Sequence, residues 1–92
     1  MTKLRIEQLV WDDFNREHIN KHNVAIAEVE EAIIQVLAHR KGRKGKIILI
    51  GRAGKRLLAI VLGQEQGNKY YPVSVRDADR KERKLVYEKE SK

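Results

Sequence analysis

Two strongly apolar segments, KIILIGR at residues 46–52 and RLLAIVLGQ at residues 56–64, lie close together in this chain. The connection between them, Ala53-Gly54-Lys55, is short and contains a glycine, which is typical of a tight β-hairpin. Because both segments are apolar almost throughout, instead of alternating with polar residues, each strand is expected to be central in its sheet. We therefore predict a central hairpin that helices cover on at least one face.

The N-terminal segment predicts a strand followed by a helix. Residues 4–11, LRIEQLVW, alternate in part between apolar and polar side chains. Either Asp12 or Asp13 is suited to cap a helix that runs roughly over residues 14–22, and Asn23 is suited to end it. The helical spacing predicts one side that carries Trp11, Phe14, His18 and His22, with Ile19 next to them.

A longer apolar pattern, AIAEVEEAIIQVLAH, predicts a second helix that begins near Ala25 and ends by Arg40 or Lys41. The segment after it, HRKGRKGK at residues 39–46, has two glycines and five cations and no apolar period. We therefore expect an exposed loop there.

The last part of the chain, residues 70–90, changes from a strand pattern to a helical one. YYPVSVR at residues 70–76 predicts a strand with Tyr71, Val73 and Val75 on one face, and Pro72 indicates an edge strand or a local irregularity. Asp79, followed three residues later by Glu82, resembles a capping box, so a helix is expected to begin near Arg80.

This order of elements indicates an α+β domain, in which a small antiparallel β-sheet is packed by two N-terminal helices and one C-terminal helix. The 92 residues are enough for one domain, residues 1–92, and too few for two. The chain has no cysteine, so neither disulfides nor thiolate metal sites are expected. Its apolar runs are too short to cross a membrane, which predicts a cytoplasmic protein without a membrane partner.

The positive charge of the chain is concentrated in its middle. The formal net charge is +7, yet residues 1–38 hold four Lys and Arg against seven Asp and Glu. Residues 39–58 hold eight cations and no acid, and residues 59–92 hold eight cations against six acids. Such a distribution favours a polyanion as partner, although it is also compatible with a basic surface that binds nothing.

Cations that neutralise phosphates release counterions, so the basic segment can bind the backbone of a nucleic acid, or it can be a solvated loop without a ligand. The candidate RNA-binding residues are Lys21, Arg40, Lys41, Arg43, Lys44, Arg52, Lys55 and Arg80. The tyrosines Tyr70, Tyr71 and Tyr87 can stack on bases or belong to the core.

His18 and His22 are four residues apart, a separation that metal sites use. A third ligand is not evident and the zincin pattern does not fit, so we predict no metal and no cofactor. The two histidines can instead pack at the edge of the core, or face RNA as proton-transfer groups.

Arg76, Glu82 and Arg83 lie around the predicted junction of strand and helix. A guanidinium can hold a phosphate at two points and stabilise charge that develops in a transition state. Glu82 can take part in proton transfer, although neighbouring cations make it a weaker base. Alternatively, Glu82 caps the helix and pairs with Arg80 or Arg83 in a purely structural network.

Three groups of residues together resemble the BrnT family over about residues 9–87. They are Trp11, Asp12, Asn15, Lys21 and His22 in the first helix, Gly51, Arg52, Arg56, Leu58 and Val61 in the hairpin, and Val75, Arg76, Ala78, Glu82 and Arg83 at the end. BrnT proteins are toxins of type II toxin–antitoxin systems with a RelE-like fold. The resemblance implies a metal-independent endoribonuclease that a cognate antitoxin protein silences.

In such toxins, basic residues and a proton acceptor are thought to drive the 2′-hydroxyl onto the adjacent phosphate. The resemblance implies that Arg76 grips the phosphate, that Arg83 assists, and that Glu82 is either an acid/base or an orienting group. His22, beside Lys21, is a further candidate for proton transfer.

The chain departs from the family pattern at Asn23, where glycine is usual, and at Val86, where an aromatic residue is expected and Tyr87 follows one position later. The basic segment is also richer in cations than the family pattern. The alternative function is a non-catalytic module that binds nucleic acid or protein. The sequence leaves open whether the protein forms a homodimer.

Overall fold

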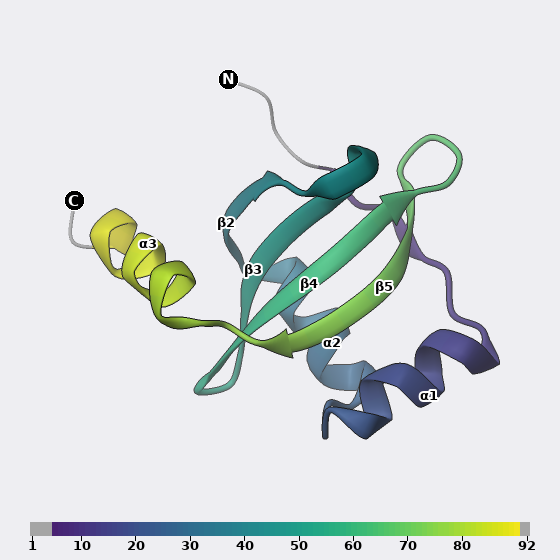
Figure 1. Cartoon of the computed structure of the whole chain (residues 1–92), viewed down its shortest axis with the longest axis horizontal. Coiled ribbons are helices and arrows are strands. Elements are labelled where there is room, and N and C mark those ends of the chain that lie inside the picture. Colours follow the sequence, from purple (N-terminus) through teal and green to yellow (C-terminus); the bar gives the residue numbers. More distant parts are fainter. Residues whose placement is uncertain (1–4, 91–92) are drawn as a thin grey trace.

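The computed structural model describes residues 5–90, which form a five-stranded mixed sheet with three helices (Figure 1). The sheet order is β1-β5-β4-β3-β2, in which β1 runs parallel to β5 and every other pair is antiparallel. The predicted α+β class is therefore confirmed, but the sheet is mixed and not wholly antiparallel as predicted, because the short β1 pairs in parallel with β5. In chain order the elements are β1 (Gln8–Leu9), α1 (Asp13–Lys21), α2 (Ile26–Ile34), β2 (Val36–Lys41), the 3-10 turn η1 (Arg43–Gly45), β3 (Ile47–Ala53), β4 (Arg56–Gln64), β5 (Lys69–Asp77) and α3 (Arg80–Glu90).

The predicted central hairpin is confirmed as β3 and β4, whose register runs from Ile47 opposite Leu62 to Ala53 opposite Arg56. Gly54, in the turn, has a positive φ of 61°, a conformation that glycine adopts without a steric penalty. Both strands are buried along most of their length because the sheet carries helices on its two faces. Within residues 5–90, no helix is both long and apolar enough to cross a membrane.

Two hydrophobic clusters lie on opposite faces of the sheet. The larger one packs α1 and α2 against the sheet and contains the buried residues Ile19, Val24, Val29, Ala32, Leu49, Ala53, Leu58, Ile60, Leu62, Tyr70 and Val75. The smaller one lies under α3 and contains Ala38, Ile50, Leu57, Ala78 and Val86. Figure 1 shows α3 at one end of its face, so it covers only part of the sheet.

The first helix forms where it was predicted, but it turns a different side toward the core. Its N-cap is Asp12, whose carboxylate accepts from the Asn15 N–H at 2.9 Å, while the Asn15 side chain accepts from the Asp12 N–H. The Asn15 amide also donates to the Val10 carbonyl, which fixes the rotation of the helix. As a result Asn15 and Ile19 are buried and Trp11 packs against the core, whereas Phe14 is 75% exposed, so the predicted apolar side was wrong at Phe14.

The predicted strand over residues 4–11 is shorter than expected. Only Gln8 and Leu9 pair with β5, opposite Lys69 and Tyr70. Leu4, the first residue of that prediction, lies outside the described residues.

The second helix was predicted to reach Arg40 or Lys41, and this was wrong, because it ends at Ile34. The next residues form β2, which pairs with β3 from Val36 opposite Gly51 to Lys41 opposite Ile47. Pairing satisfies the backbone of β3 on that side, which a longer helix would have left without hydrogen bonds. The predicted loop over residues 39–46 was therefore also wrong in its first part, and only η1 and its flanking residues form a turn.

The predicted irregularity at Pro72 is confirmed as a β-bulge in β5. Leu62 of β4 pairs with Pro72 and Val61 pairs with Ser74, so Val73 is the extra residue. Val75 then pairs with Ile60, which lies on the same core face as Leu62. Val73 and Val75 consequently do not share the face that strict alternation predicted.

Candidate nucleic-acid interface

The start of α3 places a carboxylate beneath the surface. Asp79 Oδ1 accepts from the Glu82 N–H at 2.8 Å, and Glu82 Oε1 accepts from the Asp79 N–H at 2.8 Å. This is the predicted capping box, with Asp in the place of Ser or Thr. Because the residue at this helical position faces the sheet, Glu82 is only 3% exposed. The capping interaction therefore fixes a buried charge at the junction of β5 and α3.

Two arginines from distant parts of the chain meet this carboxylate. Arg76, near the end of β5, donates from Nη1 to Glu82 Oε1 at 2.7 Å and from Nη2 to Oε2 at 3.0 Å. Arg40, on β2, donates from Nη2 to Oε2 at 3.3 Å. Their side chains remain 40% and 51% exposed, respectively. One buried carboxylate thus holds two guanidinium groups that still face solvent.

The two guanidinium groups differ in how many donors they keep for a ligand. A guanidinium has five N–H donors. Arg76 uses two on Glu82 and a third on the Asp77 carbonyl, whereas the only hydrogen bond of the Arg40 side chain among the described residues goes to Glu82. Arg40 therefore has more free donors, and Arg76 is the more firmly fixed of the two.

The environment of Glu82 favours its ionised form. Burial alone raises the pKa of a carboxyl group, but the hydrogen bonds from Arg76 and the Asp79 N–H outweigh it and lower the pKa of Glu82 to about 2. In turn, the hydrogen bond to Glu82 raises the pKa of Arg76 above its ordinary value. Glu82 is thus an anion at neutral pH that two cations already occupy, which makes it a weak proton acceptor and a good orienting group.

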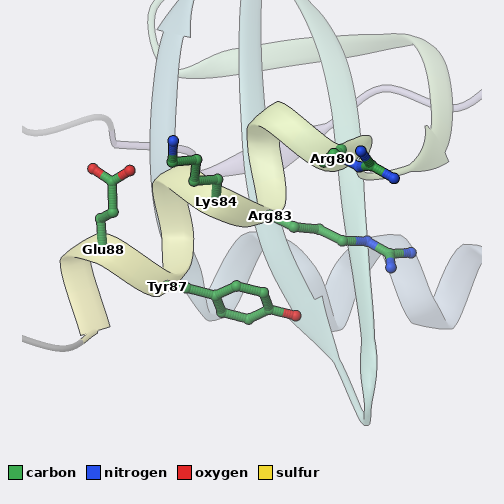
Figure 2. A pocket seen from close by; sticks show the side chains of 5 residues that line it. All are labelled: Arg80, Arg83, Lys84, Tyr87 and Glu88. Atoms are coloured by element: carbon green, nitrogen blue, oxygen red, sulfur yellow. The ribbon is translucent and has the colours of Figure 1, made fainter.

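Arg83 lies on another side of α3, and no hydrogen bond or ion pair joins its side chain to the Glu82 carboxylate. Its Nε donates to the Ala78 carbonyl at 3.1 Å, and its side chain extends from the same side of the helix as Tyr87 (Figure 2). These two residues, with Arg80, Lys84 and Glu88, line a surface pocket on α3. The predicted partners of Glu82, Arg80 or Arg83, were therefore wrong, and Arg76 and Arg40 take that place.

A second network ties the end of β5 to the other face of the sheet. Arg56 donates from Nε to Asp77 at 2.7 Å, and from Nη1 to Glu28 at 3.2 Å and to the Asn23 carbonyl at 2.9 Å. The hydrogen bond that Asp77 accepts from Arg56 lowers the pKa of Asp77. Arg56 belongs to the residues that resemble BrnT, but nothing in the sequence pairs it with carboxylates so far away in the chain. Its role here is to join the loop after α1 to the sheet.

His22 and Lys21 lie at the end of α1, on the face of the sheet opposite α3 (Figure 1). Both are exposed, and the His22 ring lies 5.2 Å from the His18 ring. Among the interactions of residues 5–90, none joins His22 to Arg76, Glu82 or Arg83. The same part of the chain contains no group of three His, Asp or Glu that could hold a metal ion.

The other basic candidates are spread over the surface. Arg52 pairs with Glu90 at 2.9 Å, and Lys21 lies 3.9 Å from Glu17. Lys55 is exposed at the hairpin turn, Arg80 is exposed at the start of α3, and Lys41, Arg43 and Lys44 are exposed at the end of β2 and in η1. Lys41, Arg43 and Lys44 thus follow Arg40 directly along β2 and η1. Arg80 lines the α3 pocket with Arg83, and Lys55 lines a second pocket that also includes Arg83.

The three tyrosines have different environments. Tyr70 is buried in the larger core cluster, the Tyr71 hydroxyl donates to the Asp12 carboxylate at 2.9 Å, and Tyr87 is 56% exposed. Of the three, only Tyr87 has a mainly exposed ring.

Comparisons of the chain with protein-family models, with curated proteins and with solved structures found no match. The resemblance to the BrnT family, and the RelE-like fold that it implies, therefore stay predictions.

Proposed function

We propose that this protein binds RNA through Arg40 and Arg76, cleaves it without a metal ion, and acts as the toxin of a toxin–antitoxin pair. The observation that carries the proposal is the pair of exposed guanidinium groups held by one buried carboxylate, Glu82. A guanidinium whose position is already fixed loses less entropy when it binds a phosphate. The net charge of +7 adds long-range attraction to a polyanion.

The proposed reaction is an attack of an RNA 2′-hydroxyl on the adjacent phosphorus. A bond forms between O2′ and phosphorus, and the bond from phosphorus to O5′ breaks. Solvent water takes the proton of the 2′-hydroxyl and supplies a proton to the leaving O5′. The products are a cyclic phosphate and a 5′-hydroxyl. Arg76 and Arg40 would stabilise the negative charge that develops on the phosphoryl oxygens. Glu82 would orient both groups and would not itself take the proton.

A second candidate is a module that binds RNA without cleaving it, and the electrostatics of Glu82 favour it. The pKa of Glu82 is lowered to about 2, and its oxygens accept hydrogen bonds from Arg76, Arg40 and the Asp79 N–H. Within residues 5–90, no histidine is hydrogen-bonded to this group. On this view the site has two guanidinium groups that can bind phosphate, but no side chain that can accept the proton of the 2′-hydroxyl.

Binding and cleavage are tested with the same variants. We would incubate the protein with single-stranded RNA in EDTA, measure binding at several salt concentrations, and look for fragments with cyclic phosphate ends. Arg40→Ala should weaken RNA binding. It should also reduce the slope of the logarithm of the binding constant against the logarithm of the salt concentration by about one unit, because one phosphate contact is lost. The matched control is Arg16→Ala, which removes the same charge from an exposed position on α1.

The outcomes separate the two candidates. Fragments from the wild type that disappear in Arg40→Ala, while circular dichroism shows a folded protein, would support the enzyme. Salt-dependent binding without fragments would support the binding module. Equal binding by Arg40→Ala and Arg16→Ala would contradict both, because the charge would then act without a site.

The toxin role is tested separately in cells. Induced expression of the wild type should arrest growth, Arg40→Ala should relieve the arrest at equal protein level, and a short neighbouring reading frame should encode an antitoxin that restores growth. Normal growth at high wild-type expression would argue against a toxin.

A further inference from the structure

The strand β2 is the last in the sheet order and leaves one backbone edge open. Gly42 N–H donates to the Lys46 carbonyl, and Arg52 N–H donates to the Gln35 carbonyl. In the antiparallel register of β2 and β3, hydrogen-bonded residues alternate along β2. Ala38 and Arg40, which are four and two residues before Gly42, therefore direct their backbone groups toward β3. His39 and Lys41 therefore direct theirs outward, and no hydrogen bond from another described segment reaches them. Figure 1 shows α3 beside β2, and α3 is a helix that does not join the sheet as a further strand.

The surroundings of this edge have a distinct polarity. At the start of β2 lie two exposed apolar side chains, Ile34, which is 81% exposed, and Val36, which is 37% exposed. Toward its end the exposed side chains are His39, Arg40 and Lys41, followed by Arg43 and Lys44 in η1. Residues 39–58 contain no acid. The edge thus offers apolar contacts at one end and positive charge at the other.

Charged side chains on an edge strand prevent unwanted pairing between copies of the same chain. Here the charge has one sign, so a second copy of β2 would be repelled. The same cations would attract an extended segment that carries carboxylates, and an added strand would receive main-chain hydrogen bonds from His39 and Lys41. The positive charge therefore disfavours a second copy of β2 and favours an acidic strand at this edge.

We propose that the outer edge of β2 binds an extended acidic segment of a partner protein by β-strand addition. The segment would place apolar residues against Ile34 and Val36 and carboxylates against His39, Lys41 and the η1 cations. This binding depends on the backbone edge and does not require that the protein binds or cleaves RNA.

The probe for the test is a blocked ten-residue peptide in which Glu alternates with Thr, with two leucines at one end. Its control keeps the glutamates and leucines and replaces each threonine with proline, so that it keeps the charge but cannot pair along its backbone. In the isotope-labelled wild type, the His39 and Lys41 amides should exchange rapidly in the free protein and at least about tenfold more slowly with the first peptide. The inward-facing amides of Ala38 and Arg40 provide the internal reference.

A variant pair tests the backbone contribution. His39→Pro removes the outward N–H, and His39→Thr keeps it while removing the same side chain. By fluorescence anisotropy, the proline variant should bind the peptide about tenfold more weakly than the threonine variant, since it loses one hydrogen bond and the close approach of the strand. Because the exchange experiment uses the wild type, the proposal stays testable even if the proline variant does not fold.

Three results would overturn the proposal. The first is binding of both peptides with equal affinity and without protection of His39 and Lys41, because charge alone would then be responsible. The second is the absence of binding by either peptide. The third is protection of the same amides by an eight-nucleotide single-stranded RNA but not by the peptide, which would assign the edge to nucleic acid.

Discussion

The substitution Glu82→Gln tests the reasoning about the buried carboxylate most directly. The pKa of this group is lowered from its ordinary value of 4.5 to about 2, although burial raises it, because hydrogen bonds from Arg76 and the Asp79 N–H stabilise the anion. A carboxyl group with a lowered pKa contributes stability that is complete above the ordinary value and is lost as the pH falls toward the folded-state value. The two pKa values imply a loss of about 2 kcal/mol between pH 5 and pH 3.

The side chain in Glu82→Gln keeps an oxygen that can accept a hydrogen bond from the Asp79 N–H. It has no carboxyl group, so it does not titrate in this pH range. We expect the wild type to be more stable than this variant at pH 5, and its advantage to shrink by about 2 kcal/mol at pH 3. The measurement is urea unfolding followed by circular dichroism at several pH values. Taking the difference between the two proteins removes the contributions of the other carboxylates with lowered pKa values, Asp12, Glu28 and Asp77.

The matched control is Val86→Ala, which removes a fully buried side chain from the same helix without removing a titrating group. It should cost about 2 kcal/mol, and that cost should be the same at pH 5 and pH 3. If the advantage of the wild type over Glu82→Gln is also constant between these pH values, the ion pair with Arg76 does not hold the Glu82 carboxylate as the structure implies.

Two further predictions concern the packing of the sheet. Gly51→Ala should destabilise the protein by more than about 2 kcal/mol, because a Cβ at this position would collide with the Ala32 carbonyl oxygen of α2. Gly63→Ala should have a small effect, since its Cβ would meet only ordinary contacts at 3.5 Å or more. Thermal unfolding of the two variants compares them, and equal losses would contradict the close approach of α2 to β3. Arg56→Ala should lower the free energy of unfolding by about 1 to 2 kcal/mol through the lost hydrogen bonds to Asp77 and Glu28, and an unchanged urea midpoint would show that this network contributes nothing.

The sequence predicted the elements whose signals are local. The hairpin around Gly54, the helix cap at Asp12 and the capping box at Asp79 depend on residues within three or four positions of each other, and all of them form. β2 was missed because the residues after Ile34 continue the helical spacing of α2, while strand formation there depends on the open edge of β3. The period of a pattern carries no information on such a non-local partner.

The candidate site was predicted in part for the same reason. Arg76 and Glu82 are six residues apart across one junction, so the sequence could bring them together. Arg40 is 42 residues from Glu82, and the predicted helix ending at Arg40 would not have placed Arg40 beside that carboxylate. The burial side of α1 was also missed, because the hydrogen bond from Asn15 to the Val10 carbonyl, rather than the apolar period alone, sets the rotation of this helix.

The different environments of the two arginines imply different roles. Arg76 makes both strong contacts to Glu82 and a third to the Asp77 carbonyl, so Arg76→Ala should leave the buried carboxylate with Arg40 alone and reduce stability as well as binding. Arg40 makes one longer contact and is half exposed, so Arg40→Ala should reduce RNA binding with little loss of stability. Urea unfolding and RNA titration of both variants measure this contrast. If Arg40→Ala destabilises the protein as much as Arg76→Ala does, Arg40 serves mainly to hold α3 on the sheet, and the phosphate-binding role falls to residues outside this pair.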